Sequence, residues 1–548
     1  MPRSLLLERL EDRVLLNAAT PVAGIDLPAE DFINEAFDFA VTFDNTAAAG
    51  PDSTGFAPYV DLRLPAALDL QALRISYLGA DVVPLARATF DGAQWLLDGA
   101  PLAEHPLTGL ALDGADALTA GATAGDQLLI VQLPFGSFTA DQPVARLDFG
   151  GVDLGGTVGI ANSIATRGGF AFGCDEFDNP DTDAPLVQAP VSADITPIVI
   201  ELAKRHDGPE DETATGPNYA RTWTLEVDIA AGETVTGLTL ADVLPGASAW
   251  LGNLTFVQGG TPVVLSEPAI DADGPALELA YGDVTGVAGP DIIVTYQLYI
   301  PDVIADDDGD DNDDGAPDNP FVNAAEVGAG YLGNPVTDTA SDTLIGKLVA
   351  VQKAVTLSDD VEGNGPTPGD TLSYTLNFQV SDYTDLSAIT LTDVLGNGLA
   401  VDTGFAPTFV FNENGVSTSG TFALTSGPGN PFTGNVAQSD LGGGLTRLVF
   451  DVSQELIDRG QDGTLAGDAL SAATTGSVTF RARILEDYAA PAPGPDLSID
   501  IGDVLDNDVT VSGTTAGGDV ESDTSAASIT IAGIELAKSI YAVDGDTG

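Results

Sequence analysis

The sequence predicts an all-β protein built from tandem β-sandwich modules. The 548 residues include 63 Gly and 34 Pro with 44% hydrophobic residues, a composition typical of short strands joined by turns. A length well above the usual domain size of about 100 to 200 residues predicts several cores rather than one. Internal repetition, described below, is the third observation, and it indicates that the modules share one fold.

Strands are predicted where apolar residues alternate with polar ones. The alternation is clear in Trp223, Leu225 and Val227, and again in the segment 371–380 at Tyr374, Leu376 and Phe378. Each of these strands is followed by a shared Asp-Val-Leu. Later in each block come further alternating segments, at 292–300 and 477–488, and then the expected closing strands at 321–331 and 505–513.

Three segments repeat along the chain: 179–206, 334–355 and 517–540. In each one, an acidic, Thr-rich stretch that we expect to be a turn leads into an apolar strand that carries a lysine. The repeats divide the chain into an amino-terminal segment and four modules, of which the first is divergent and the last is truncated: 1–20, 21–195, 196–343, 344–532 and 533–548. Because the last repeat stops just after its lysine, we expect the sequence to be the amino-terminal part of a longer protein.

The repeats resemble the DUF11 family of bacterial surface repeats and the related D2-type domains that form isopeptide bonds. The resemblance is carried by the Lys-bearing strand, by "GDTLSYTLNF" at 369–378, by "LTDVL" at 391–395 and by an Asn-bearing last strand. It implies immunoglobulin-like sandwiches that serve as stalk or adhesive repeats. The chain departs from the family at Ser381 and Asp382, where Asn is usual, and at Gly396, where the preceding block keeps Pro245.

The opening residues resemble the LEPR-XLL motif of very large bacterial surface proteins. Leu10, Glu11, Arg13, Leu15 and Leu16 match, and Asp12 replaces the proline of the motif. The resemblance implies export and an extracellular or cell-surface location. A short amphipathic helix that caps the first module is the alternative. No run of about 18 apolar residues predicts a membrane span.

Charge and cysteine content narrow the possible partners. With 83 acidic and 18 basic residues the formal net charge is −65, which repels nucleic acid and anionic lipid. The excess of carboxylates favours stabilisation by divalent cations or salt, although solubility alone is an alternative reason for it. The single cysteine, Cys174, excludes an intramolecular disulfide.

The lysines are the most informative residues of the sequence. The chain has only four, and three of them, Lys204, Lys353 and Lys538, occupy the equivalent point of the repeat. A buried, neutral lysine can attack an Asn amide while a neighbouring carboxyl group relays the proton and ammonia leaves. The recurrence of Asp in the shared Asp-Val-Leu, at Asp242 and Asp393, offers that carboxyl group.

The resemblance to D2-type domains implies that the partner amides are Asn323 and Asn507 on the last strands, and that Asp242 and Asp393 are the acids. Recurrence through duplication alone, with each lysine reaching a surface carboxylate, is the alternative. The first module has Asn162 but no lysine precedes residue 204, so we expect it to lack such a bond.

The acidic segment before residue 320 predicts a calcium site. Asp310, Asn312, Asp314 and Asp318, with Gly315 at the turn, match the start of an EF-hand-type loop, in which oxygen ligands alternate around a hard cation. Position 12 is Phe321 instead of Glu, so the usual closing ligand is missing. An acidic loop without an ion is the alternative.

Signals for catalysis are few, and we predict no enzyme. The two histidines, His105 and His206, lie in no catalytic or metal-binding motif, and no Gly-rich phosphate loop is found. Trp223 fits a core position, whereas Trp95 and Trp250 lie near turns where partial exposure is expected. The predicted function is a calcium-stabilised stalk or adhesive region that binds an unknown surface ligand or neighbouring copies. A glycan- or protein-binding module and a self-assembling coat component are the alternatives.

Overall fold

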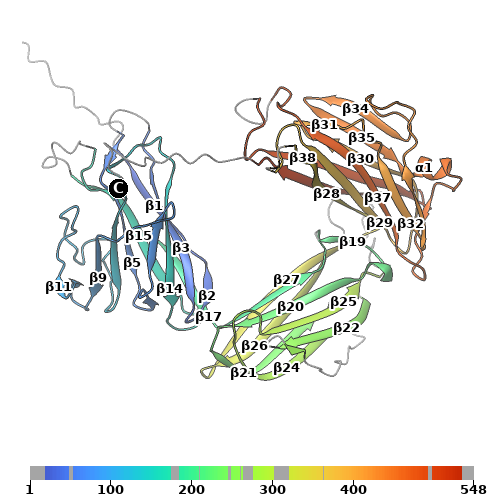
Figure 1. Ribbon diagram of the computed structural model, residues 1–548. Helices are drawn as coiled ribbons and strands as arrows, with labels where there is room; N and C mark the ends of the chain where they lie inside the picture. The colour runs from blue at the N-terminus through green and yellow to red at the C-terminus, as the bar shows by residue number, and fades with distance from the viewer. Residues whose placement is uncertain are drawn as a thin grey trace, which may run out of the picture.

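The computed structural model contains three β-sandwiches in series, which confirms the predicted all-β class (Figure 1). It describes residues 19–532, apart from 49–52, 175–183, 209, 245–248, 259–260, 263–275, 302–319, 362, 364 and 492–496. Each sandwich has a main core of its own, to which strands of both its sheets contribute apolar side chains. The segments 1–18 and 533–548, with the LEPR-XLL-like motif and Lys538, lie outside the described residues.

The first sandwich pairs a six-stranded sheet with a larger one. The smaller sheet has the order β1 (Pro21–Asp26), β3 (Ala36–Asn45), β14 (Ala145–Leu154), β7 (Arg74–Tyr77) and β8 (Ala80–Asp81), with β6 (Leu68–Asp69) beside β14. The larger has the order β11 (Ala100–Pro101), β10 (Trp95–Leu97), β9 (Ala86–Phe90), β12 (Gln127–Gln132), β5 (Pro58–Leu64), β15 (Asn162–Phe170), β17 (Val191–Ile198) and β2 (Glu30–Phe32), with β16 (Leu186–Val187) beside β15. A short pair, β4 (Gly55–Phe56) and β13 (Ser137–Phe138), completes it.

The second sandwich packs two five-stranded sheets. One has the order β18 (Ile200–His206), β20 (Arg221–Ile229), β25 (Ile292–Tyr299), β22 (Ala249–Gln258) and β23 (Thr261–Pro262). The other has the order β19 (Glu212–Ala214), β27 (Asn334–Lys347), β26 (Pro320–Tyr331), β21 (Thr234–Val243) and β24 (Ala276–Thr285). A 3-10 turn at Pro217–Tyr219 precedes β20.

The third sandwich repeats most of this arrangement. One sheet has the order β28 (Val349–Asp359), β29 (Thr371–Val380), β37 (Thr474–Ile484), β32 (Thr408–Glu413) and β33 (Val416–Thr421), with β31 (Leu399–Val401) beside β37. The other has the order β34 (Val436–Gly442), β35 (Leu445–Asp451), β30 (Asp385–Leu395), β38 (Val504–Thr515) and β39 (Val520–Thr530), with β36 (Leu465–Ala466) beside β30. The helix α1 (Val452–Asp458) follows β35 and is capped by the Asp451 carboxylate. The Lys-bearing strands β18 and β28 occupy the same edge position in the two sandwiches.

In the second and third repeats the acidic, Thr-rich segments are strands, so the expectation of turns is wrong there. β27 and β39 form long antiparallel pairs with β26 and β38, and they follow the strands that we expected to close each sandwich. β27 lies at the rim, where most of its side chains are partly or fully exposed, so it lacks the apolar alternation by which a strand is recognised. One residue, Leu348, then separates it from the next sandwich.

Carboxylates of β27 cover the backbone of the edge strand β18. Asp338 accepts a hydrogen bond from Leu202 N at 2.6 Å, and Asp342 accepts one from His206 N at 2.7 Å. In the third sandwich, Asp523 and Ser525 of β39 accept from Val351 N and Lys353 N. These contacts satisfy backbone donors that an uncovered edge would offer to another chain.

The joint between the first and second sandwiches is short and well contacted. Val199 alone separates β17 from β18, and Ile33 of the first sandwich is buried in the core of the second. Asn34 Nδ2 donates to Glu233 Oε1 at 2.9 Å, and Ala231 N donates to Glu35 Oε1 at 2.6 Å. Both the core and the polar contacts therefore cross this boundary.

The joint between the second and third sandwiches is almost entirely polar. Asp382 accepts hydrogen bonds from Asn218 N and Asn218 Nδ2, both at 2.9 Å, and Thr215 Oγ1 lies 2.5 Å from Ser381 Oγ. The Tyr219 hydroxyl lies 2.6 Å from the Val380 carbonyl oxygen. Ser381 and Asp382, at which the sequence departs from the family pattern, thus bind the 215–219 loop.

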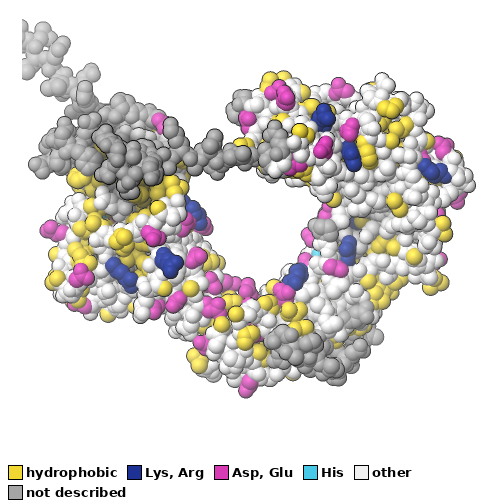
Figure 2. All heavy atoms as spheres, in the orientation of Figure 1, with side chains coloured by type: hydrophobic (Ala, Val, Ile, Leu, Met, Phe, Trp, Pro, Cys, Tyr) yellow, Lys and Arg dark blue, Asp and Glu magenta, His cyan; other side chains and the backbone are white. Residues whose placement is uncertain are grey.

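Acidic side chains are spread over the visible faces of all three sandwiches, with Lys and Arg as isolated points (Figure 2). Across the described residues, we find no helix that combines the length and apolarity needed to span a membrane.

Candidate functional site

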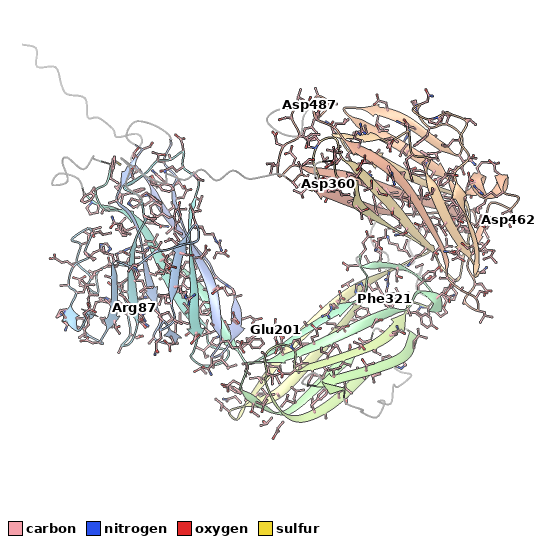
Figure 3. All side chains as sticks on the ribbon, in the orientation of Figure 1. Arg87, Glu201, Phe321, Asp360, Asp462 and Asp487 are labelled. Carbon is pink, nitrogen blue, oxygen red and sulfur yellow. The ribbon has the colours of Figure 1, made fainter. Side chains whose placement is uncertain are left out.

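Strand register builds two buried Lys-Asp-Asn sites from the predicted residues. In the second sandwich, Lys204 points inward from the edge strand β18, since it alternates with Ala203 and Arg205, which are exposed. Asp242 of β21 and Asn323 of β26 point inward from the opposite sheet, and both are fully buried. β18 begins near Glu201 and β26 near Phe321, at opposite ends of this sandwich (Figure 3).

A chain of hydrogen bonds connects the three residues of the second sandwich. Lys204 Nζ donates to Asp242 Oδ1 at 2.6 Å, and the Tyr296 hydroxyl donates to Asp242 Oδ2 at 2.5 Å. Asn323 Nδ2 donates to the Tyr296 oxygen at 2.7 Å, while the buried Asn323 Oδ1 has no hydrogen-bond partner. The amide is therefore held by its nitrogen, and its carbonyl group is left unsatisfied.

The third sandwich holds the same three residue types. Lys353 Nζ donates to Asp393 Oδ2, and both side chains are fully buried. Asn507 is also fully buried, and neither its Nδ2 nor its Oδ1 makes a hydrogen bond. A buried amide with no partner costs about 1–3 kcal/mol for each unsatisfied group, so this side chain is poorly explained by packing.

Burial shifts the pKa values at both sites toward the neutral forms. Desolvation lowers the pKa of Lys204 and of Lys353 to about 8, against the opposing effect of the neighbouring carboxylates. Desolvation also raises the pKa of Asp393 to about 6, although Lys353 opposes the shift. A neutral amine is a nucleophile and a protonated carboxyl group is an acid, so the pair is suited to proton transfer.

Aromatic rings cover the lysines from the neighbouring strand. Lys204 Nζ lies 5.6 Å from the ring centre of Trp223, and Lys353 Nζ lies 5.2 Å from that of Tyr374. Trp223 is 1% exposed, as the sequence predicts. The rings exclude water from the lysines and thereby maintain the desolvation that lowers their pKa.

The first sandwich has a different buried polar network, which the sequence analysis missed. Asp61, at the centre of β5, lies 3.0 Å from His105 Nε2 and 2.9 Å from Arg167 Nε, and Arg167 Nη1 lies 2.6 Å from Asp116 Oδ2. The His105 Nδ1 atom accepts from two backbone N–H groups. The sequence offers no motif here, because the four residues come from separate segments.

Asn162 of the first sandwich donates to the Gly155 carbonyl oxygen.

Other predicted residues are outside these sites. The calcium candidates Asp310, Asn312, Asp314 and Asp318 lie outside the described residues. Trp95 is 2% exposed and packs in a satellite core, so the expected partial exposure is wrong, and Trp250 is half-buried against the second core. The short strands β9 to β11 wrap Trp95, which single-sequence turn signals do not reveal.

Comparison with protein-family models finds no matching family, and comparison with curated proteins finds no match. Among solved structures, the chain aligns with the C-terminal domain of the Streptococcus pyogenes antigen I/II-family protein AspA, at 12% identity over 60% of this chain and 99% of that one, with a TM-score of 0.20. It also aligns with BcpA, the major pilin subunit of Bacillus cereus, at 9% identity over 84% and 95% of the two chains, with a TM-score of 0.21. A third is the collagen-binding subdomain of the Enterococcus faecalis surface protein ACE, at 14% identity over 32% and 92%, with a TM-score of 0.18.

These aligned structures are domains of bacterial surface and pilin proteins. TM-scores this low carry no argument about what the present chain does. The resemblance to DUF11 and to LEPR-XLL stays a prediction.

Proposed function

We propose that the chain is a structural stalk region of an exported bacterial surface protein, and that its second and third sandwiches are each locked by an isopeptide bond. The bonds would join Lys204 to Asn323 and Lys353 to Asn507. The observation that carries the proposal is the burial of a lysine, a carboxyl group and an unsatisfied Asn amide together at both sites. Duplication alone does not explain why the amides remain unsatisfied.

The reaction needs no external reagent. Lys Nζ attacks Asn Cγ, the new C–N bond forms, the bond from Cγ to Nδ2 breaks, and one proton passes from Nζ through the Asp carboxyl group to the leaving nitrogen. The products are a secondary amide and ammonia, and the carboxyl group is regenerated. The substrate of the reaction is therefore the folded protein itself, and the role of the resulting bond is mechanical.

The positions of the bonds suit a stalk that carries tension. The chain enters the second sandwich on β18 and leaves it on β27, which forms a hairpin with β26. A bond between β18 and β26 passes the load from one sheet to the other without unfolding the strands between. It also closes a loop of about 120 residues, which by the chain-entropy relation for cross-links stabilises the fold by ~4–5 kcal/mol.

The test is the intact mass of the purified full chain. Two bonds remove two ammonia molecules, about 17 Da each, and proteolysis should yield branched peptides that join the Lys204 segment to the Asn323 segment and the Lys353 segment to the Asn507 segment. A chain of full calculated mass with no branched peptide contradicts the proposal.

We also propose that calcium stabilises the second sandwich through Asp310, Asn312, Asp314 and Asp318. Support comes from the ligand spacing and from position, because Asp318 lies two residues before β26, the strand that carries Asn323. Calcium should raise the melting temperature of the second sandwich, whose unfolding is reported by Trp223 and Trp250. An unchanged melting temperature in excess calcium and in chelator contradicts the site.

A further inference from the structure

Each site contains one buried tyrosine hydroxyl, and the two hydroxyls come from different strands. Trp223 of β20 pairs with Tyr296 of β25, whereas Tyr374 of β29 pairs with Phe480 of β37. β20 corresponds to β29, and β25 corresponds to β37. The tyrosine of the aromatic pair is therefore on β25 in the second sandwich, but on β29, the counterpart of β20, in the third. Tyr296 and Tyr374 are both fully buried.

In the second sandwich, the hydroxyl lies between the acid and the leaving group. It donates to Asp242 Oδ2 and accepts from Asn323 Nδ2, and these are the contacts of a relay between carboxyl group and amide nitrogen. Lys204 occupies the other oxygen of Asp242, so Lys204 and Asn323 are connected only through the carboxylate and the phenol.

In the third sandwich, the hydroxyl of Tyr374 is buried and makes no hydrogen bond. Desolvation raises the pKa of both Tyr374 and Asp393, and the Asn507 side chain opposes both shifts, so the amide lies beside both groups. An unsatisfied buried hydroxyl destabilises the fold, and Phe, the residue at the paired position 480, would fill the core without that cost. Packing therefore does not account for the oxygen atom.

We propose that the tyrosine hydroxyl, Tyr296 in the second sandwich and Tyr374 in the third, delivers the proton to the Asn nitrogen that leaves as ammonia. The inference rests on the isopeptide chemistry proposed above. After Lys Nζ has added to Cγ, the phenol gives its proton to Nδ2 and takes one from the Asp carboxyl group, which is reprotonated from Nζ. Phenol and carboxyl group end as they began, and ammonia carries the transferred proton away.

The experiment follows bond formation in newly synthesised full-length chain. After pulsed synthesis, samples are quenched at intervals and each branched peptide is quantified by mass spectrometry. Tyr296→Phe should slow the Lys204–Asn323 bond about 10²-fold, a typical loss for a proton-transfer group, without slowing the Lys353–Asn507 bond. Tyr374→Phe should do the reverse. Tyr281→Phe is the matched control, because it removes a buried hydroxyl of the second sandwich that has no hydrogen-bond partner.

Two further variants separate chemistry from packing. The double variant Tyr374→Trp, Phe480→Tyr places Trp and Tyr on the same strands that carry Trp223 and Tyr296 in the second sandwich. It should restore most of the rate that is lost in Tyr374→Phe. In an Asn507→Ala background, which cannot react, Tyr374→Phe should leave the melting temperature unchanged or higher. If wild type forms both bonds and the Tyr→Phe variants react at the rate of Tyr281→Phe, the inference is overturned. If wild type forms no bond, the proposed function itself fails.

Discussion

Asn507 lies diagonally across the strand pair from Asp393, because the direct partner of Asp393 is Val509 and Asn507 is two residues away on the same strand. Asn323 has the same offset from Asp242, whose direct partner is Ala325. Residues two apart on a strand share a face, so acid and amide of each site both face the lysine of the opposite sheet. The two sandwiches differ in sequence but have the same two-residue offset between the acid and the amide.

Asp393→Asn should abolish the bond of the third sandwich while leaving that of the second intact. The change keeps the size of the side chain but removes the carboxyl group that we propose as the proton relay, and loss of such a group typically costs 10²–10⁴-fold in rate. The variant should then lie below its own calculated mass by only one ammonia, about 17 Da, where wild type lies below its own by two. The Lys204–Asn323 peptide is the internal control, and a variant that still loses two ammonia molecules contradicts the role of Asp393.

The unreacted third site should have a stability minimum near neutral pH. In Asn507→Ala, the pKa of Lys353 is expected to stay near the value of about 8 that burial gives it, below the ordinary 10.5 that it has when unfolded. The folded state then binds fewer protons than the unfolded state between pH 8 and 10.5, so stability should rise with pH across this window.

The Asp393 pKa of about 6, raised from 3.8, has the opposite consequence. The folded state binds more protons between pH 4 and 6, so stability should fall as pH rises through that range. Urea unfolding of Asn507→Ala from pH 4 to 10.5 covers both pH ranges, with wild type as the reference for all other groups. The rise in stability above pH 8, on the order of 3 kcal/mol, should be absent from wild type. There the lysine nitrogen would be part of the isopeptide amide, which does not titrate. Parallel pH profiles for the two proteins are the contrary result.

The sequence predicted the parts of each site that recur and missed the parts that do not. Lys204 and Lys353 stand out because lysine is rare in this chain, and Asp242 and Asp393 because they lie in a repeated tripeptide. Tyr296 and Tyr374 could not be found by alignment, since the hydroxyl changes strand between the two copies. Their correspondence is seen only in the strand pairing, where Trp223 faces Tyr296 on β20 and β25 and Tyr374 faces Phe480 on β29 and β37.

The fold was predictable to a similar extent. Strands with one buried face, such as β20 and β29, alternate in the sequence and were predicted within a few residues. β27 was not predicted, because it is a rim strand whose inward Asp338 and Asp342 meet backbone N–H groups instead of a core. Ser381 and Asp382 gave no signal of a joint, because their partners lie more than 160 residues earlier in the chain.

Arg167→Met should destabilise the first sandwich by ~3–5 kcal/mol. The change leaves the fully buried Asp61 and the nearly buried Asp116 without the guanidinium that pairs with both, and an uncompensated buried charge is costly. Trp95 is the only tryptophan of this sandwich, so its fluorescence during urea unfolding of a Trp223→Phe, Trp250→Phe chain reports the loss.

Arg146→Met is the matched control for Arg167→Met. Arg146 also pairs with two carboxylates, Asp26 and Asp148, but all three side chains are more than half exposed, and exposed pairs contribute little to stability. Equal losses in the two variants would show that burial of the Asp61 network contributes nothing.

Asp382→Ala combined with Tyr219→Phe should loosen the joint between the second and third sandwiches without unfolding either. The two changes remove the carboxylate that holds Asn218 and the hydroxyl that lies 2.6 Å from the Val380 oxygen and 2.7 Å from the Thr474 oxygen. Small-angle X-ray scattering should then give a broader distribution of interatomic distances than wild type. Asp440→Ala, in an exposed hairpin of the third sandwich, is the control and should scatter like wild type. Since the proposed covalent bonds lie inside the sandwiches, the joint variant should still lose both ammonia molecules. An unchanged distance distribution in the joint variant would contradict the role of Asp382 and Tyr219 in fixing the angle between the two sandwiches.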